Sequence, residues 1–305
     1  MDSALVSVGL PAALAIIMFG LGLSLTPDDF RRVARHPRAV LVILGCQVVL
    51  LPLIGFAIAE VAGLAPELAV GLLLLAASPG GTTANLFSHL FRGDVALNIT
   101  LTAVNSVLAL VTLPIVVNLA IARYLDESSG VGVQLSKMVQ VFAIVLVPVA
   151  IGMLVRSRAP GFADRADRPV RIASAVILLL VVVGAILGED NVGEYFAQVG
   201  LVTTVFCALS LAVGFFMPRL LGLTPAQCVA SGFEIGIHNS TLAIAVALTV
   251  LDNTTIGVPP AVYGIVMFPV AALFGFVLNR TGVLAGIPAV GATDETDPAP
   301  ARDRR

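Results

Sequence analysis

One charged residue, Glu234, lies within the apolar stretch that runs from Arg219 to Asp252, and this stretch is long enough to span a membrane. A carboxylate held inside a membrane is costly and needs a partner. Hard cations such as sodium prefer oxygen ligands, and Glu234 offers both carboxylate and backbone carbonyl oxygen. Its type and setting therefore predict a cation site. The alternative is a glutamate at a helix end that pairs with a cytoplasmic arginine.

Two short segments are predicted to break helices at membrane depth. The first contains Pro79, Gly80 and Gly81, where proline removes a backbone donor and the glycines supply flexible joints. The second contains Gly236 and His238. Unwound backbone inside a membrane is tolerated where it lines a cavity or packs within protein. A simple packing kink is the alternative for the first segment.

The helix halves that follow these breaks are predicted to bind an organic anion. Carbonyl groups freed at a break bind cations, and the N–H groups at the start of a half-helix bind anions. The residues that begin the second halves are therefore predicted to hold a carboxylate or sulfonate group, and they are Thr82, Thr83, Asn239 and Ser240.

The composition of the chain places this chemistry in a membrane. Of 305 residues, 58% are hydrophobic and 12% are charged, which excludes an ordinary soluble enzyme, a disordered chain and a nucleic-acid binder. Nine charge-free stretches of spanning length predict an all-α polytopic membrane protein with nine spans. The three cysteines are isolated in apolar runs and show no metal or disulfide pattern.

The positions of the arginines predict the orientation of the chain. Arginines gather after the odd-numbered spans, at 31–38, 92, 156–171, 219 and 280. The positive-inside rule then puts the N-terminus outside and the C-terminus in the cytoplasm, in the inner membrane of the cell. The N-terminus lacks a basic region, so we expect no cleaved signal peptide. Residues 284–305 are predicted to form a disordered cytoplasmic tail.

A weak internal similarity predicts an inverted repeat. Gly63-Leu64-Ala65-Pro66 begins the third span, and Gly222-Leu223-Thr224-Pro225 begins the eighth, with Thr224 and Gln227 spaced as a helix capping box. Pro79 and His238 stand equally far after the two prolines. Broken helices of opposite direction in corresponding places are typical of inverted-repeat secondary transporters. We expect a first repeat over residues 1–125, with four spans, and a second over 126–283, with five.

Three motifs resemble the signatures of the bile acid:sodium symporter family. They run from Met18 to Phe30, from Ser78 to Thr102 and from Glu234 to Ser240. The resemblance implies a core domain, in which two broken helices cross, and a panel domain made of spans one, five and six. Bacterial family members usually have ten spans. Because the Met18 motif lies in the first span, the resemblance implies that the first family helix is absent here.

The resemblance also implies two sodium sites. The first maps onto Asn85, Asn98, Thr102 and Glu234. Ala84 stands where the family has a serine and so lacks a hydroxyl ligand, whereas Asn98 replaces a serine but keeps a side-chain oxygen. Taken singly, each polar residue is equally suited to a hydrogen bond between helices.

The second implied sodium site maps onto Gln47, Glu234, Ile235, Ile237 and His238. The family has glutamine in place of His238. Imidazole offers nitrogen, which suits a hard cation poorly, and it can be protonated near neutral pH. Either sodium uses only backbone oxygen there, or the second ion is weakened or replaced by a proton. For Gln47, an interhelical hydrogen bond is the alternative.

These observations predict a sodium-coupled symporter that imports an organic anion by alternating access. The expected partners are the anion, bile-acid-like or a small carboxylate or sulfonate, together with sodium and the lipid bilayer, and we expect no cofactor and no nucleic acid. A proton-coupled carrier or an exporter of the same fold is the alternative. A membrane enzyme is disfavoured because the spans hold no paired aspartates, Ser–His pair or zinc motif. A scaffold or receptor without transport is also disfavoured.

Overall fold

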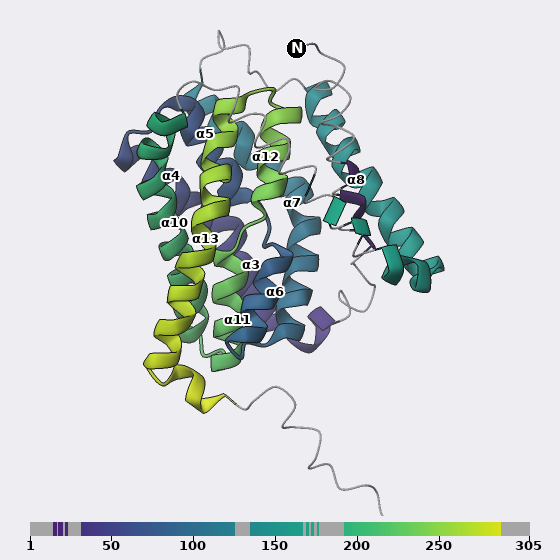
Figure 1. Ribbon diagram of the computed structural model, residues 1–305, viewed down its shortest axis with the longest axis vertical. Coiled ribbons are helices and arrows are strands. Elements are labelled where there is room, and N and C mark those ends of the chain that lie inside the picture. Colours follow the sequence, from purple (N-terminus) through teal and green to yellow (C-terminus); the bar gives the residue numbers. More distant parts are fainter. Residues whose placement is uncertain are drawn as a thin grey trace, which may run out of the picture.

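The computed structural model describes residues 15, 16, 18–20, 22, 23, 32–125, 135–166, 169, 170, 172, 173, 176 and 192–287, and these residues are almost entirely helical (Figure 1). The first elements are η1 (Arg32–Arg35), α3 (Pro37–Gly45), η2 (Cys46–Leu50), α4 (Leu51–Ala62), α5 (Pro66–Ala77) and α6 (Thr82–Leu90). They are followed by α7 (Val95–Tyr124), α8 (Leu135–Arg158), α10 (Val192–Leu220), α11 (Pro225–Gly236), α12 (Ser240–Thr249), α13 (Thr254–Arg280) and η4 (Val283–Gly286).

Four continuous helical segments of the described chain are long and apolar enough to cross a membrane. They are Pro37–Ala62, Val95–Tyr124, Phe196–Leu220 and Thr254–Arg280. Together with the shorter apolar helices α5 and α12, they make this a multi-pass all-α membrane protein. Most of the first and sixth predicted spans lies outside the described residues, as does the predicted repeat boundary at 125/126, so the nine spans and the two repeats stay predictions.

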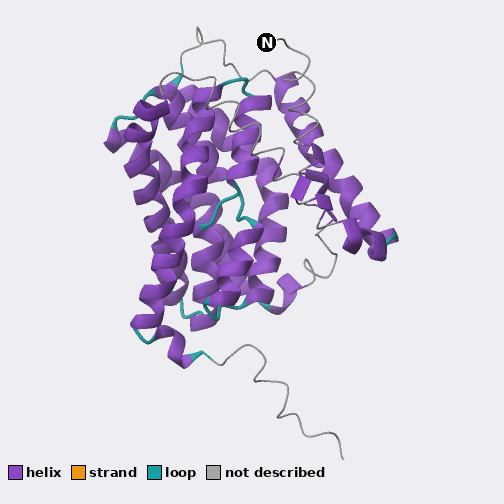
Figure 2. Cartoon of the chain, viewed as in Figure 1, coloured by secondary structure: helices purple, strands orange, loops and turns teal. Residues whose placement is uncertain are grey.

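Both predicted helix breaks are present. One helix ends at Ala77 and resumes at Thr82, and another ends at Gly236 and resumes at Ser240. The two interrupted helices run in opposite directions, since α5 and α12 occupy one end of the bundle and α6 and α11 the other (Figure 1). Their unwound connections meet about halfway along the bundle (Figure 2).

The starts of the two interrupted helices follow from their sequence. Pro66 and Pro225 each occupy the first helical position, where a missing N–H is harmless. The Thr224 side chain accepts from the Gln227 amide, and the Gln227 side chain accepts from the Thr224 amide. The predicted capping box is therefore confirmed.

Charged side chains separate toward the two ends of the bundle. At one end, Arg38 donates to the Leu221 carbonyl oxygen at 2.6 Å, and Arg92 donates to that of Leu284 at 3.4 Å. At the other end, Arg123 forms an ion pair with Glu60 at 2.9 Å. Charged side chains at both ends of the bundle agree with the predicted positions of the loops. The assignment of the end that carries Arg38 and Arg92, the basic end, to the cytoplasm stays a prediction.

The packed chain extends farther than the sequence indicated. Residues Val283–Gly286 form a 3-10 helix, and the side chains of Leu284 and Ile287 are buried. The predicted disordered tail therefore cannot begin at residue 284, because its first residues pack on the core. Residues 288–305 lie outside the described part of the chain.

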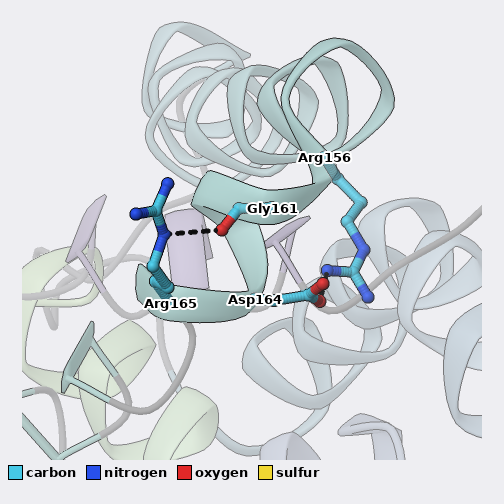
Figure 3. A network of polar contacts seen from close by, with 4 residues as sticks. All are labelled: Arg156, Gly161, Asp164 and Arg165. Carbon is cyan, nitrogen blue, oxygen red and sulfur yellow. Dashed lines mark hydrogen bonds and ion pairs between the residues drawn. The ribbon is translucent and has the colours of Figure 1, made fainter.

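Helix α8 lies to one side of the main bundle (Figure 1). Gly152 lies against the backbone of Phe19 and Gly22, which allows a close helix approach. After α8 the chain folds back on itself, so that Arg156 contacts Asp164 and Arg165 donates to the Gly161 carbonyl oxygen at 2.9 Å (Figure 3). Two arginines of this basic loop are thus engaged in local contacts.

The crossing is the place where the two unwound connections, 78–81 and 237–239, meet. The core around it is tightly packed where α5 meets α13. A Cβ atom at Gly71 would overlap the Ile256 carbonyl oxygen and would crowd the Pro259 ring. Small residues allow membrane helices to approach in this way, and their enlargement forces the backbones apart. The contact fixes α5, and with it the first break, against α13.

The variant Gly71→Ala is expected to lower the unfolding temperature in detergent by several degrees, because overpacking costs about 1–3 kcal/mol. The matched control is Gly257→Ala, since the nearest atom to a Cβ there is 3.7 Å away. Unfolding can be followed by the reaction of a thiol dye with the buried Cys46, Cys207 and Cys228. Equal unfolding temperatures for the two variants would contradict this packing.

Candidate functional site

The two helix breaks are joined by backbone hydrogen bonds. Gly80 and His238 form an isolated antiparallel bridge. The Gly81 amide donates to the Ile237 carbonyl oxygen at 2.9 Å, and the Asn239 amide donates to that of Pro79 at 2.8 Å. Backbone groups that the breaks release are therefore satisfied within the protein, as the interior of a membrane requires.

The Glu234 carboxylate lies directly beside this crossing and is buried, with 1% of the residue exposed. Its Oε2 atom accepts from Asn98 Nδ2 at 2.8 Å and from the Thr102 hydroxyl at 2.6 Å. Both partners project from α7. Within the described residues Glu234 has these two partners and no arginine, which removes the alternative of an ion pair at a helix end.

Gly80 covers the other side of the same carboxylate. A Cβ atom at this position would overlap the carboxylate oxygens of Glu234. The glycine therefore does more than loosen the helix, because it lets the backbone of the first break lie against the carboxylate on α11.

Several buried oxygen atoms have no hydrogen-bond donor. They are Oε1 of Glu234, Oδ1 of its partner Asn98 and, on α6, Oδ1 of Asn85. Buried polar atoms normally find a partner, and oxygen atoms without donors are suitable ligands for a hard cation. The structure thus brings Asn98, Thr102 and Glu234 into contact and gives Asn85 an available oxygen. Ala84, fully buried, adds no polar group.

The second set of predicted ligands has a different arrangement. Gln47 Nε2 donates to the Ser78 carbonyl oxygen at 3.0 Å, and His238 Nδ1 lies 3.2 Å from the same oxygen. Gln47 Oε1 and His238 Nε2 have no hydrogen-bond partner. Ile235 is fully buried on α11, and the Ile237 carbonyl oxygen accepts from Gly81. Gln47 lies in the π-helical turn η2, a feature frequent at functional sites.

The predicted anion-binding residues differ in their burial and in their hydrogen bonds. The Asn239 side chain accepts from the Leu242 amide at 3.0 Å, so its oxygen caps α12. Ser240 is buried and its hydroxyl has no partner. Thr82 is the first residue of α6 and Thr83 is half-buried. Ser240 is therefore the predicted anion ligand whose side chain is both buried and available.

Two residues that sequence reasoning missed, Phe206 and Tyr263, lie against His238. The imidazole stacks on Phe206, with ring centroids 5.6 Å apart, and meets Tyr263 edge-on at 5.4 Å. The Tyr263 hydroxyl donates to the Gly236 carbonyl oxygen at 2.8 Å, and Cys207 Sγ lies 3.7 Å from that oxygen. A tyrosine hydroxyl inside an apolar span is a signal that could have identified Tyr263, because a buried hydroxyl needs a partner.

Comparisons with known proteins agree with this geometry. Residues 11–194 match the model of the Sodium Bile acid symporter family. The chain belongs to that family. It is 28% identical to the ileal sodium/bile acid cotransporter of Oryctolagus cuniculus, over 89% of this chain and 79% of the relative. It is also 28% identical to YocS of Bacillus subtilis, described as an uncharacterized sodium-dependent transporter, over 83% and 77% of the two chains.

A third relative comes from a plant. The probable sodium/metabolite cotransporter BASS2 of Oryza sativa chloroplasts is 28% identical over 90% of this chain and 64% of its own length. Membership in a family of cotransporters makes this protein a transporter and not an enzyme. This excludes the alternative of a membrane enzyme, which the sequence already disfavoured.

Gly80→Ala is expected to abolish stabilisation by sodium, because the added methyl group would displace the Glu234 carboxylate. Gly81→Ala is the matched control, since a Cβ there would come no closer than 3.6 Å to any neighbouring atom. The measurement is the change in unfolding temperature when sodium chloride replaces choline chloride. If sodium still stabilises Gly80→Ala, the Glu234 carboxylate is not part of the ion site.

Proposed function

We propose that the protein is a sodium-coupled symporter that imports an organic anion by alternating access. The observation that carries the proposal is the buried Glu234 carboxylate at the crossing, with oxygen atoms around it that lack donors. Glu234 and Asn98 supply these oxygens, and both Asn98 and Thr102, on α7, donate to the carboxylate. A monovalent cation that binds them offsets a charge that is otherwise expensive in a membrane.

The anion is proposed to bind at the starts of α6 and α12. Both half-helices begin at the crossing, and their N-terminal N–H groups provide partial positive charge. No lysine or arginine is buried among the described residues. Anion binding would then depend on helix termini, on the Ser240 hydroxyl and on the nearby cation. Sodium and anion would therefore bind cooperatively, because each lowers the cost of the other.

The class of the anion is inferred from the family. The relatives are named as cotransporters of bile acids and metabolites, and we infer an organic anion with a carboxylate or sulfonate group for this chain. The proposed orientation keeps the basic end of the bundle in the cytoplasm, with the N-terminus outside. The two interrupted helices would belong to two inverted repeats, whose relative movement exposes the crossing to each side in turn.

A second candidate is a proton-coupled carrier or an exporter of the same fold. The observation that favours it is His238 within the crossing, where Nε2 is buried and lacks a partner, together with Ala84 in place of a hydroxyl. Proteoliposomes separate the candidates. Uptake driven by a sodium gradient supports the symporter, whereas uptake driven by a proton gradient in sodium-free buffer supports the second candidate.

Glu234→Gln is expected to abolish sodium-dependent stabilisation and to reduce sodium-driven uptake at least tenfold, because the neutral amide cannot offset a cation. The matched control is Glu194→Gln, at an exposed residue of α10. A thermal-shift screen of small carboxylates and sulfonates, with and without sodium, first identifies the transported anion. Sodium-driven uptake by Glu234→Gln at the normal rate would refute the proposed function.

A further inference from the structure

We propose that Tyr263, on α13, is a positioning residue for the ion site: its hydroxyl holds the carbonyl group of Gly236 and thereby leaves the neighbouring carbonyl group of Ile235 free for sodium. The inference rests on the proposed function and deepens it, because it adds a residue that sets the geometry of the second predicted sodium site. It is based on the hydrogen bonds of the second break and on the packing of α13 against both of its sides.

The second break releases carbonyl groups at the end of α11. In a continuous α-helix, the oxygen of Ile235 would accept from the amide of Asn239. That of Gly236 would accept from the amide of Ser240. Here the Asn239 amide donates to the first break instead, and the Ser240 amide donates to His238. Both oxygens therefore lose their helical donors, at a depth where water does not replace them.

The structure replaces one of these two donors. The Tyr263 hydroxyl donates to the Gly236 oxygen at 2.8 Å, and Cys207 Sγ lies 3.7 Å from the same oxygen. The Ile235 oxygen receives no donor from the described residues. The two adjacent carbonyl groups thus differ, because one is bound to a side chain and the other is available to a hard cation, which prefers oxygen ligands.

Tyr263 is itself held in a fixed place. Its side chain is fully buried, and its ring contacts those of Phe206, with centroids 5.9 Å apart, and His238. These ring contacts, together with the hydrogen bond that a buried hydroxyl needs, give the hydroxyl one direction. A Cβ atom at Gly236 would overlap the side chain of Leu211, so the accepting peptide group has little room to turn away.

Helix α13 contacts the second break on both sides. Gly264, which follows Tyr263, lies against Ser240, where an added Cβ atom would come within 3.3 Å of the serine Cβ. The same turn of α13 therefore binds the last residue of α11 and packs against the first residue of α12. Fixing the Gly236 carbonyl also limits the rotation of the Ile235 carbonyl, because the backbone has only two soft dihedral angles per residue.

The test compares Tyr263→Phe with Thr203→Val. The first variant keeps the ring and removes the hydroxyl, whereas the control removes a buried hydroxyl that donates within its own helix. The measurement is the sodium concentration that gives half of the full thermal stabilisation of the purified full-length protein, with choline chloride keeping the ionic strength constant. We expect this concentration to rise about tenfold in Tyr263→Phe, because partners that orient ion ligands control affinity, and to stay unchanged in Thr203→Val.

Each other outcome of this comparison has a definite meaning. A merely structural role of Tyr263 would lower the unfolding temperature in choline chloride without changing the half-saturating sodium concentration. An unchanged or lower concentration in Tyr263→Phe, or an equal rise in both variants, would overturn the role of Tyr263 and leave the proposed function in place. A wild-type protein that sodium does not stabilise would refute the proposed function itself, and the inference with it.

A second measurement uses the wild-type chain and so does not depend on the folding of a variant. Isoleucine labelled with ¹³C at the carbonyl carbon and glycine labelled with ¹⁵N select the four Ile–Gly pairs of the sequence. The signal of Ile235 is assigned by its loss in Ile235→Val. We expect sodium to shift the Ile235 carbonyl resonance in NMR spectra of the protein in lipid bilayers. An unshifted resonance, under conditions in which sodium stabilises the protein, would overturn the inference.

Discussion

Inside a bilayer, the backbone groups released where a helix is interrupted have no water to bind, and at this crossing they bind one another. The Gly81 and Asn239 amides each donate to a carbonyl of the opposite break. Each interruption is therefore tolerable because the other exists beside it. The antiparallel arrangement of the two helices, the depth of the breaks and the meeting of residues far apart in sequence all follow from this reciprocal pairing.

The pairing also determines where a charge can be held. The backbone of Gly80 lies against the Glu234 carboxylate, and the carboxylate's two hydrogen-bond donors among the described residues both come from α7. Asn98 and Thr102 supply those donors but no positive charge. The site is thus polar enough to keep a carboxylate in the core and still has no positive charge among the described residues, which suits the proposed cation.

Local rules predicted the parts of this site that depend on a few neighbouring residues. A proline followed by two glycines breaks a helix wherever it occurs, and the Thr224–Gln227 capping box needs four residues. The contact of Glu234 with Asn98 and Thr102 joins distant segments, so no local spacing predicted it and the family resemblance was needed. Gln47 turns its NH₂ group to Ser78, whose carbonyl is freed by a break in another helix, while its Oε1 atom has no partner, so its role as an ion ligand stays a prediction. Tyr263 and Phe206 were missed for the same reason, since their roles depend on where the second break lies in space.

The π-helical turn at Cys46–Leu50 gives the span that carries Gln47 an unusual property. Leu51 donates to the carbonyl oxygen of Cys46, so this turn holds one residue more than an α-helical turn, directly before Pro52, which has no N–H to donate. Each residue of an α-helix advances the chain by roughly 100° around its axis. Deletion of one residue here would restore a regular turn but rotate α3 against α4 by about that angle, and either Ile43 or Ala59 would leave its buried position. The length of this span is therefore constrained to the single residue.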